Sequence, residues 1–222
     1  MRVAALISGG KDSILALHKI FDGNEVIFLV SAIPERADSY MFHTANIHMV
    51  EAVAECLSIP LIKIRVSGEE EKEVEEFAEG LKDLDVDALC VGAIESNYQR
   101  RRVEKICKKL GFKLIAPLWK SNPENLLQEV AKKFEAIITS VSAEGLGREF
   151  LGRKIDEKLI KELLTLKREK GIHPAGEGGE YETLVLNAPL YKKRILIKDS
   201  EIIWRRVSGE LVIKNYELVQ KF

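Results

Sequence analysis

Short apolar runs alternate with amphipathic stretches along the first part of the chain, and this alternation constrains the fold more than any other feature of the sequence. The apolar runs occur at residues 3–7, 25–32, 61–66, 88–92, 113–116 and 136–140. Apolar residues recur with helical spacing at residues 13–21, 43–57, 69–84, 98–110 and 123–133. Continuous apolar runs are typical of strands buried on both faces, and strands separated by single helices favour right-handed crossovers. The sequence therefore predicts an α/β fold built on a parallel sheet.

The pattern changes after Pro117. A charged amphipathic helix is expected at residues 156–170, and strand-like runs then follow without helices between them, at residues 184–186, 194–198, 202–207 and 211–218. Turn-like links at residues 199–201 and 208–210 favour antiparallel pairing of the last three runs. We therefore expect two domains, a nucleotide-sized α/β domain at residues 1–117 and a smaller α+β domain at residues 118–222.

Composition excludes several classes of protein. Lys and Arg number 34 against 35 Asp and Glu, so there is no overall basic field to hold nucleic acid. The 3 cysteines form no Cys-x-x-Cys pair, which argues against a disulfide scaffold, a zinc ribbon and a thiol-redox motif. No stretch approaches the ~18 apolar residues of a membrane helix. We expect a cytoplasmic protein with no membrane segment and no stable nucleic-acid partner.

The most informative motif lies where the first predicted strand gives way to the first predicted helix, the position at which open α/β sheets bind phosphates. It consists of Ser8, Gly9, Gly10, Lys11, Asp12 and Ser13, which we call the phosphate loop. Its glycines let the backbone approach an anion, the amides at the helix start face it, and Lys11 adds a positive charge. The spacing matches neither a Walker A loop nor a Gly-x-Gly-x-x-Gly dinucleotide turn.

Three further residues are candidates for the same nucleotide site. Gly92 follows a buried strand, so its loop should lie beside the phosphate loop at the carboxyl edge of the sheet. Among the arginines at 100–102 we choose Arg100 for a phosphate contact, the alternative being a charge on a solvated helix face. His43 could line the nucleotide pocket, or could be a packing or surface residue. The four histidines lack metal-ligand spacing, so a zinc site is not expected.

Residues 173–183, which we call the glutamate segment, gather three carboxylates among three glycines just before a predicted strand. Such carboxylates could bind magnesium or take up a proton during a reaction, whereas a solvated turn needs fewer of them. We select Glu180 and Glu182 as catalytic candidates.

The phosphate loop resembles the SGGKDS signature of the PP-loop, or N-type, ATP pyrophosphatases. That resemblance implies a HUP-like (adenine nucleotide alpha hydrolase-like) domain and cleavage of ATP between its α and β phosphates through an adenylated intermediate. It also implies magnesium as a cofactor, for which Asp12 is the candidate ligand, and catalytic roles for Lys11 and Asp12.

Residues 92–104 and 176–183 resemble two hallmarks of archaeal diphthine-ammonia ligases, and residues 145–147 with 151–153 match a looser third. This resemblance covers nearly the whole chain. It implies that the substrates are ATP, ammonia and elongation factor 2, on which the carboxylate of diphthine becomes the carboxamide of diphthamide. AMP and pyrophosphate would be released. With ammonia as a substrate, the carboxylates of the glutamate segment could hold ammonium or take the proton that attacking ammonia loses, and we expect the second domain to recognise the acceptor and ammonia.

Two other functions remain compatible with a PP-loop. A tRNA-modifying enzyme is disfavoured, because the thiolases of that superfamily generally use paired cysteines and a tRNA binder should show a broad basic face. A nucleotide sensor without chemistry would have no need for the glutamate segment. The cysteines lie in apolar patterns, so we expect free ammonia and not glutamine as the nitrogen donor. Homo-oligomerisation is left open.

Overall fold

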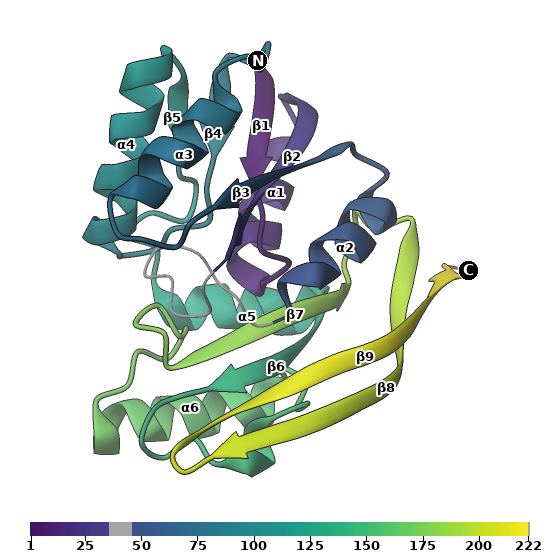
Figure 1. Ribbon diagram of the computed structural model, residues 1–222. Coiled ribbons are helices and arrows are strands. Elements are labelled where there is room, and N and C mark those ends of the chain that lie inside the picture. Colours follow the sequence, from purple (N-terminus) through teal and green to yellow (C-terminus); the bar gives the residue numbers. More distant parts are fainter. Residues whose placement is uncertain (36–45, 222) are drawn as a thin grey trace.

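The computed structural model describes residues 1–35 and 46–221, which build two sheets (Figure 1). The first is a five-stranded parallel sheet with the order β3-β2-β1-β4-β5. Its strands are β1 (Arg2–Leu6), β2 (Glu25–Pro34), β3 (Leu61–Val66), β4 (Ala88–Cys90) and β5 (Lys113–Ile115). The α/β fold with a parallel sheet is therefore confirmed, and each of these strands lies within two residues of its predicted position.

Helices cover both faces of the parallel sheet, as the alternation of strands and helices requires. One face packs against α1 (Lys11–Phe21), α2 (Val50–Leu57) and α5 (Pro123–Lys133), the other against α3 (Lys72–Leu81) and α4 (Asn97–Leu110). Successive residues of β1 point to opposite faces, so Val3 and Ala5 join the first cluster and Ala4 joins the second. The sheet is thus buried on both sides.

The helix boundaries are set by local chemistry at their starts. Asn122 accepts hydrogen bonds from the amides of Glu124 and Asn125 and so caps α5, which begins with Pro123. The helix expected at residues 43–57 is shorter, because a 3-10 turn at Ile47–Met49 precedes α2. Residues 43–45, including His43, lie outside the described part of the chain.

The second sheet is antiparallel, with the order β7-β6-β9-β8, and α6 (Glu157–Lys170) packs into the same core. Its strands are β6 (Glu135–Val141), β7 (Tyr181–Asn187), β8 (Lys193–Arg205) and β9 (Ser208–Gln220). The apolar run at 136–140 resembled the strands of the parallel sheet, yet β6 pairs antiparallel with β7 and β9. A buried apolar run carries no information about the direction of its partners, so the sequence could not separate the two cases.

The expected turn at residues 199–201 is wrong. Strand β8 runs through these residues with a bulge around Asp199, so the runs expected at 194–198 and 202–207 form one strand. The hairpin turns at Arg206 and Val207, just before the turn expected at 208–210. Trp204 pairs with Gly209 across the hairpin, and Arg206 has the positive φ of 51° that a tight turn needs. The polar residues near 200 mark an exposed stretch of an edge strand and not a reversal of the chain.

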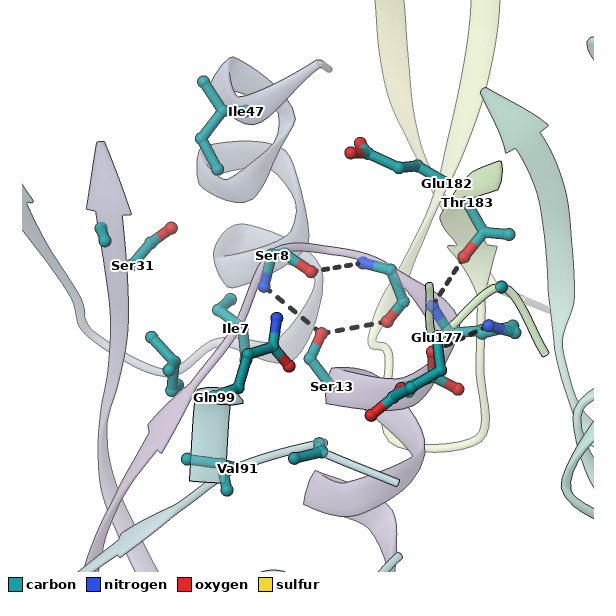
Figure 2. A pocket seen from close by; sticks show the side chains of 18 of the residues that line it. Ile7, Ser8, Ser13, Ser31, Ile47, Val91, Gln99, Glu177, Glu182 and Thr183 are labelled. Carbon is teal, nitrogen blue, oxygen red and sulfur yellow. Dashed lines mark hydrogen bonds and ion pairs between the residues drawn. The ribbon is translucent and has the colours of Figure 1, made fainter. Parts of the chain in front are cut away.

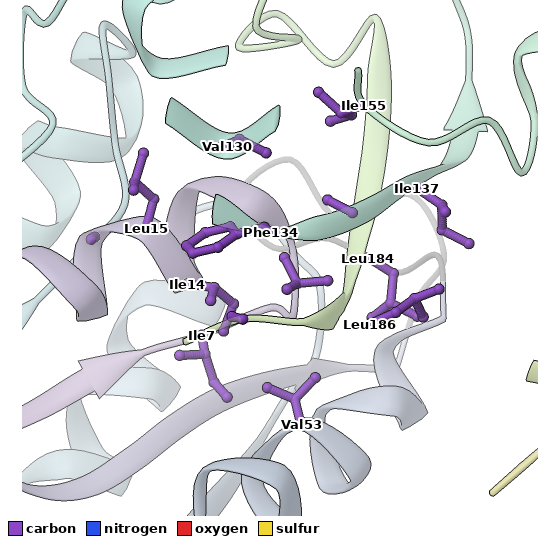
Figure 3. Close-up of a cluster of buried hydrophobic side chains, with 14 of the residues drawn as sticks. Ile7, Ile14, Leu15, Val53, Val130, Phe134, Ile137, Ile155, Leu184 and Leu186 are labelled. Carbon is purple, nitrogen blue, oxygen red and sulfur yellow. The ribbon is translucent and has the colours of Figure 1, made fainter. Parts of the chain in front are cut away.

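The two sheets share one hydrophobic core. Ile7 and Ile14 of the first part belong to the same cluster as Phe134, Ile137 and Leu184 of the second part (Figure 3). Helix α5, which follows the expected boundary at residue 117, packs in this cluster beside α1. The space between the sheets is therefore a packed interior. Across residues 1–35 and 46–221, no helix is both long and apolar enough to span a membrane.

His18 on α1 forms a hydrogen bond with the second part of the chain, and this bond should make the stability of the fold depend on pH. Its Nδ1 lies 2.7 Å from the carbonyl oxygen of Ile14, and its Nε2 accepts a hydrogen bond of 3.1 Å from the amide of Leu190. The ring also packs on Phe134, with 4.8 Å between centroids. This pattern needs the neutral imidazole with its proton on Nδ1. Burial, with help from Lys133, lowers the pKa of His18 below its ordinary value of 6.5.

The unfolded chain therefore takes up this proton more readily than the folded chain. The contribution of neutral His18 to stability should be complete above about pH 6.5 and should be lost as the pH falls through the lowered pKa. Urea unfolding between pH 8 and pH 5 should show a steeper loss of stability for the wild type than for His18→Gln, which cannot titrate. Parallel profiles for the wild type and His18→Gln would contradict this assignment.

Candidate functional site

A cavity opens where the carboxyl ends of β1, β2 and β4 face the second sheet (Figure 2). Its apolar wall is formed by Leu6, Ile7, Ala32, Ile47, Val91 and Val103. Its polar wall includes Ser8, Lys11, Asp12, Ser13, Gln99, Glu177, Glu182 and Thr183. Both the phosphate loop and the glutamate segment therefore contribute to one cavity, although about 165 residues separate them in the sequence.

The phosphate loop is folded on itself at the start of α1. Gly9 has a φ of +82°, in the left-handed region that favours glycine. The hydroxyl of Ser13 donates to the carbonyl oxygen of Gly10 at 3.0 Å and accepts from the amide of Ser8 at 3.3 Å. The first turn of α1 then presents the positive end of the helix dipole to the cavity. This arrangement suits an anion such as a phosphate.

Strand β7 of the second sheet holds the phosphate loop in place. The amide of Val185 donates to the carbonyl oxygen of Gly9 at 2.9 Å, and the amide of Lys11 donates to Oγ1 of Thr183 at 3.0 Å. A Cβ at Gly10 would lie only 3.2 Å from the carbonyl oxygen of Thr183. The loop is therefore fitted between the two sheets, and glycine at position 10 permits this close approach.

The ammonium group of Lys11 is buried and connects the phosphate loop to the glutamate segment. Its Nζ donates to the carbonyl oxygen of Ala175 at 2.5 Å and to Oδ2 of Asp12 at 2.8 Å, and it lies 5.2 Å from the centre of the Tyr181 ring. The side chain is only 4% exposed. A surface lysine is thereby excluded, and the charge stays at this end of the cavity. Sequence reasoning expected Lys11 to face a phosphate and missed its bond to Ala175.

The three carboxylates of the glutamate segment have different surroundings. Oε1 of Glu177 accepts hydrogen bonds from the amides of Ile94, Glu95 and Ser96 at 2.9–3.0 Å, at the start of α4. This contact joins the second part of the chain to the loop after β4. Glu177 was not selected from the sequence, because its partners lie more than 80 residues away and no local pattern indicates them.

The carboxylates of Glu180 and Glu182 also lie in different surroundings. The carboxylate of Glu180 accepts from the amides of His173 and Gly178 at 2.7 and 2.8 Å, which closes the glutamate segment into a compact loop. Glu182 lines the cavity, and Glu180 is not among the lining residues (Figure 2). The structure therefore brings one of the two selected carboxylates to the cavity and uses the other within the loop.

Gly92 lies beside the phosphate loop, as its position after β4 suggests. A Cβ at Gly92 would lie 2.7 Å from the backbone nitrogen of Ser13 and from the backbone carbon of Asp12. Any larger residue would push apart the loop after β4 and the start of α1. Glycine at this position thus allows the two loops to form one wall.

Arg100 is not brought to the cavity. Its Nε donates to Glu104 at 2.6 Å, and its guanidinium lies 4.3 Å from the centre of the Trp119 ring. The residues of α4 that do line the cavity are Gln99 and Val103, four positions apart on one helix face. Because each residue turns the helix by about 100°, Arg100 projects away from that face.

Asp12 is the candidate magnesium ligand on the cavity wall. Among the described residues, no group of three or more His, Cys, Asp and Glu side chains could hold a metal ion. Magnesium bound with a nucleotide needs only one or two carboxylates together with the phosphates. The position of Asp12 at the start of α1 fits magnesium that is held by one carboxylate together with the phosphates of a nucleotide.

The contact of Glu177 with α4 yields a prediction about stability. Glu177→Ala should leave three amides at the start of α4 without their acceptor, at a cost of about 1–3 kcal/mol in the free energy of unfolding. Amide exchange at residues 94–96 should become faster, as measured by hydrogen–deuterium exchange. The matched control is Glu210→Ala on the exposed face of β9, which should change neither quantity. Equal behaviour of the two variants would show that the contact does not stabilise the protein.

Two family models match this chain, and a solved structure resembles it. The family model for the diphthamide synthase N-terminal domain matches residues 1–114, and the model for the diphthamide synthase C-terminal domain matches residues 122–219. A solved structure of a predicted subunit of tRNA methyltransferase from Methanocaldococcus jannaschii is a distant likeness. It covers 85% of this chain and 98% of that chain, with 18% identity and a TM-score of 0.44.

Curated relatives align with most of the chain. The diphthine–ammonia ligase of Schizosaccharomyces pombe is 40% identical over 95% of this chain, which spans 38% of the length of that protein. The diphthine–ammonia ligase of Homo sapiens is 38% identical over 91% of this chain and 85% of its own length. Since both domain models match in order and relatives of this identity cover most of the sequence, the chain belongs to the diphthamide synthase family.

Proposed function

We propose that this chain is an ATP-dependent diphthine–ammonia ligase, which amidates the carboxylate of diphthine on elongation factor 2. The observation that carries the proposal is the shared cavity, in which an anion-binding loop and Glu182 face the same space in a member of the diphthamide synthase family. A tRNA-modifying enzyme and a nucleotide sensor are not favoured, since the curated relatives are named as ligases. The proposed site of action is the cytoplasm, where elongation factor 2 works.

The two walls of the cavity suggest how ATP would lie. The phosphates would rest against the phosphate loop, at the positive end of the α1 helix dipole. Lys11 would hold positive charge at the same end. The apolar wall formed by β1, β2 and β4 would then receive the base. Magnesium, when bound with ATP beside Asp12, would offset the charge of the phosphates.

The chemistry requires two attacks in sequence. An oxygen of the diphthine carboxylate attacks the α phosphorus of ATP, and the bond from that phosphorus to the bridging oxygen breaks as pyrophosphate departs. Ammonia then attacks the acyl carbon of the adenylate, the nitrogen loses a proton, and AMP leaves. We assign the removal of this proton to Glu182. Glu180 takes a positioning role in place of the catalytic role expected from the sequence, because its carboxylate holds the glutamate segment together.

The central test identifies the reaction products and compares the wild type with a variant of Glu182, the proposed general base. Purified protein with ATP, ammonium and diphthine-bearing elongation factor 2 should convert a carboxylic acid into an amide, detected by mass spectrometry, with AMP and pyrophosphate formed in equal amounts. Glu182→Gln should lower turnover about 10²- to 10⁴-fold, because a positioned base is lost. ATP affinity of this variant should remain close to that of the wild type.

The control for this substitution is Glu210→Gln, which removes a carboxylate outside the cavity and should leave turnover unchanged. ADP and phosphate as stoichiometric products would contradict the proposed adenylation. Full turnover by Glu182→Gln would contradict the assignment of the base and leave the reaction type intact.

The state of the cysteines predicts the nitrogen donor. Cys56, Cys90 and Cys107 are buried, and burial raises their thiol pKa values to about 11, about 12 and about 11, respectively. Such thiols are poor nucleophiles at neutral pH, so none suits the release of ammonia from glutamine. Ammonium should support amidation by the purified chain, and glutamine as sole nitrogen source should not. Comparable product from glutamine with all three cysteines replaced by alanine would overturn this reasoning.

A further inference from the structure

Ser31 lies at the wall of the cavity, and its buried hydroxyl has no partner in the part of the chain that the structure describes. It lies near the carboxyl end of β2 and is 1% exposed. Its Oγ has no hydrogen-bond partner among residues 1–35 and 46–221. Buried polar groups in native proteins are nearly always hydrogen-bonded, and an unsatisfied one costs about 1–3 kcal/mol. An exception at the wall of a cavity is explained most simply by a ligand that supplies the missing partner.

The position of Ser31 relative to the phosphate loop is fixed by the parallel sheet. The amide of Ile7 donates to the carbonyl oxygen of Val30 at 2.9 Å, which aligns the ends of β1 and β2. Ser31 therefore sits about one strand spacing, about 4.8 Å, from the residues that lead into the phosphate loop. A nucleotide with its phosphates at the start of α1 would have its nucleoside part within reach of β2.

The surroundings of Ser31 distinguish a base from a sugar. The cavity wall that includes Ser31 also carries the apolar residues Ile7, Ala32 and Ile47, and Figure 2 shows the hydroxyl of Ser31 directed toward the cavity. Pockets for flat heteroaromatic groups combine apolar walls with a small number of placed polar atoms. A ribose, with hydroxyls on one edge, would need several polar partners at this end of the cavity.

We propose that Ser31 is a specificity-determining residue whose hydroxyl forms a hydrogen bond with a polar edge atom of the ATP base. The proposal rests on the proposed function, because it assumes that the cavity binds ATP. A serine hydroxyl can both donate and accept, so it can meet a ring nitrogen or the exocyclic amino group. Ser31→Ala removes this partner without adding volume and should weaken ATP binding about 3- to 10-fold.

The experiment combines the Ser31→Ala substitution with changes to the base of the nucleotide, as in a double-mutant cycle, and measures binding affinity by isothermal titration calorimetry. Wild type and Ser31→Ala are titrated with ATP, 1-deaza-ATP, 7-deaza-ATP and the purine analogue that lacks the amino group. For the wild type, one analogue should bind about 3- to 10-fold more weakly than ATP. For Ser31→Ala, the same analogue and ATP should bind with equal affinity. Thr139→Val removes a buried hydroxyl on β6, outside the cavity, and should bind all four ligands like the wild type.

Ligand-free stability separates recognition from a structural role. Because the hydroxyl makes no bond within the described protein, Ser31→Ala without nucleotide should unfold at the same temperature as the wild type or at a higher one. A lower unfolding temperature with unchanged ATP affinity would overturn the proposal. Equal losses for every analogue in both proteins would overturn it as well. Failure of the wild type to bind ATP would refute the proposed function itself, together with this assignment.

Discussion

The contact between the phosphate loop and strand β7 is the constraint on which the rest of the site depends. Two backbone groups of the loop, the carbonyl of Gly9 and the amide of Lys11, bond to residues of β7, and the ammonium of Lys11 reaches Ala175. Without the second part of the chain, the two backbone groups would lose their partners, and the ammonium of Lys11 would keep Asp12 but lose the carbonyl oxygen of Ala175. The anion-binding loop is therefore built by both parts of the chain, although its motif lies wholly in the first.

This construction has a consequence for chemistry. Activation of a carboxylate and its attack by ammonia require two substrates and a base at one point, with water kept away from the reactive adenylate. The same strand that holds the phosphate loop carries Glu182 into the cavity, and Glu177 fixes the opposite wall through the start of α4. In the proposed mechanism, residues 173–183 would therefore position both the nucleotide and the base, Glu182.

Local patterns in the sequence predicted much of this structure, and contacts between distant segments account for the rest. Continuous apolar runs placed the parallel strands because burial on both faces leaves a clear signature. Arg100 was chosen among the three arginines at 100–102 because charge suggests a phosphate contact. Helix rotation instead decides which side chains meet the cavity, and those of α4 are Gln99 and Val103. Ser31 was missed although a serine within an apolar strand was a visible signal. The partners of Lys11 and Glu177 could not be predicted, since no pattern pairs residues 80 to 160 positions apart.

The central claim is that nucleotide binding acts on both parts of the chain through one cavity. Hydrogen–deuterium exchange of the full chain, with and without α,β-methylene-ATP, tests this most directly because that nucleotide cannot be cleaved between its α and β phosphates. The account predicts that residues 8–13 and residues 173–185 become protected together, at the same nucleotide concentration. Protection of residues 8–13 alone, with exchange at 173–185 unchanged, would contradict it.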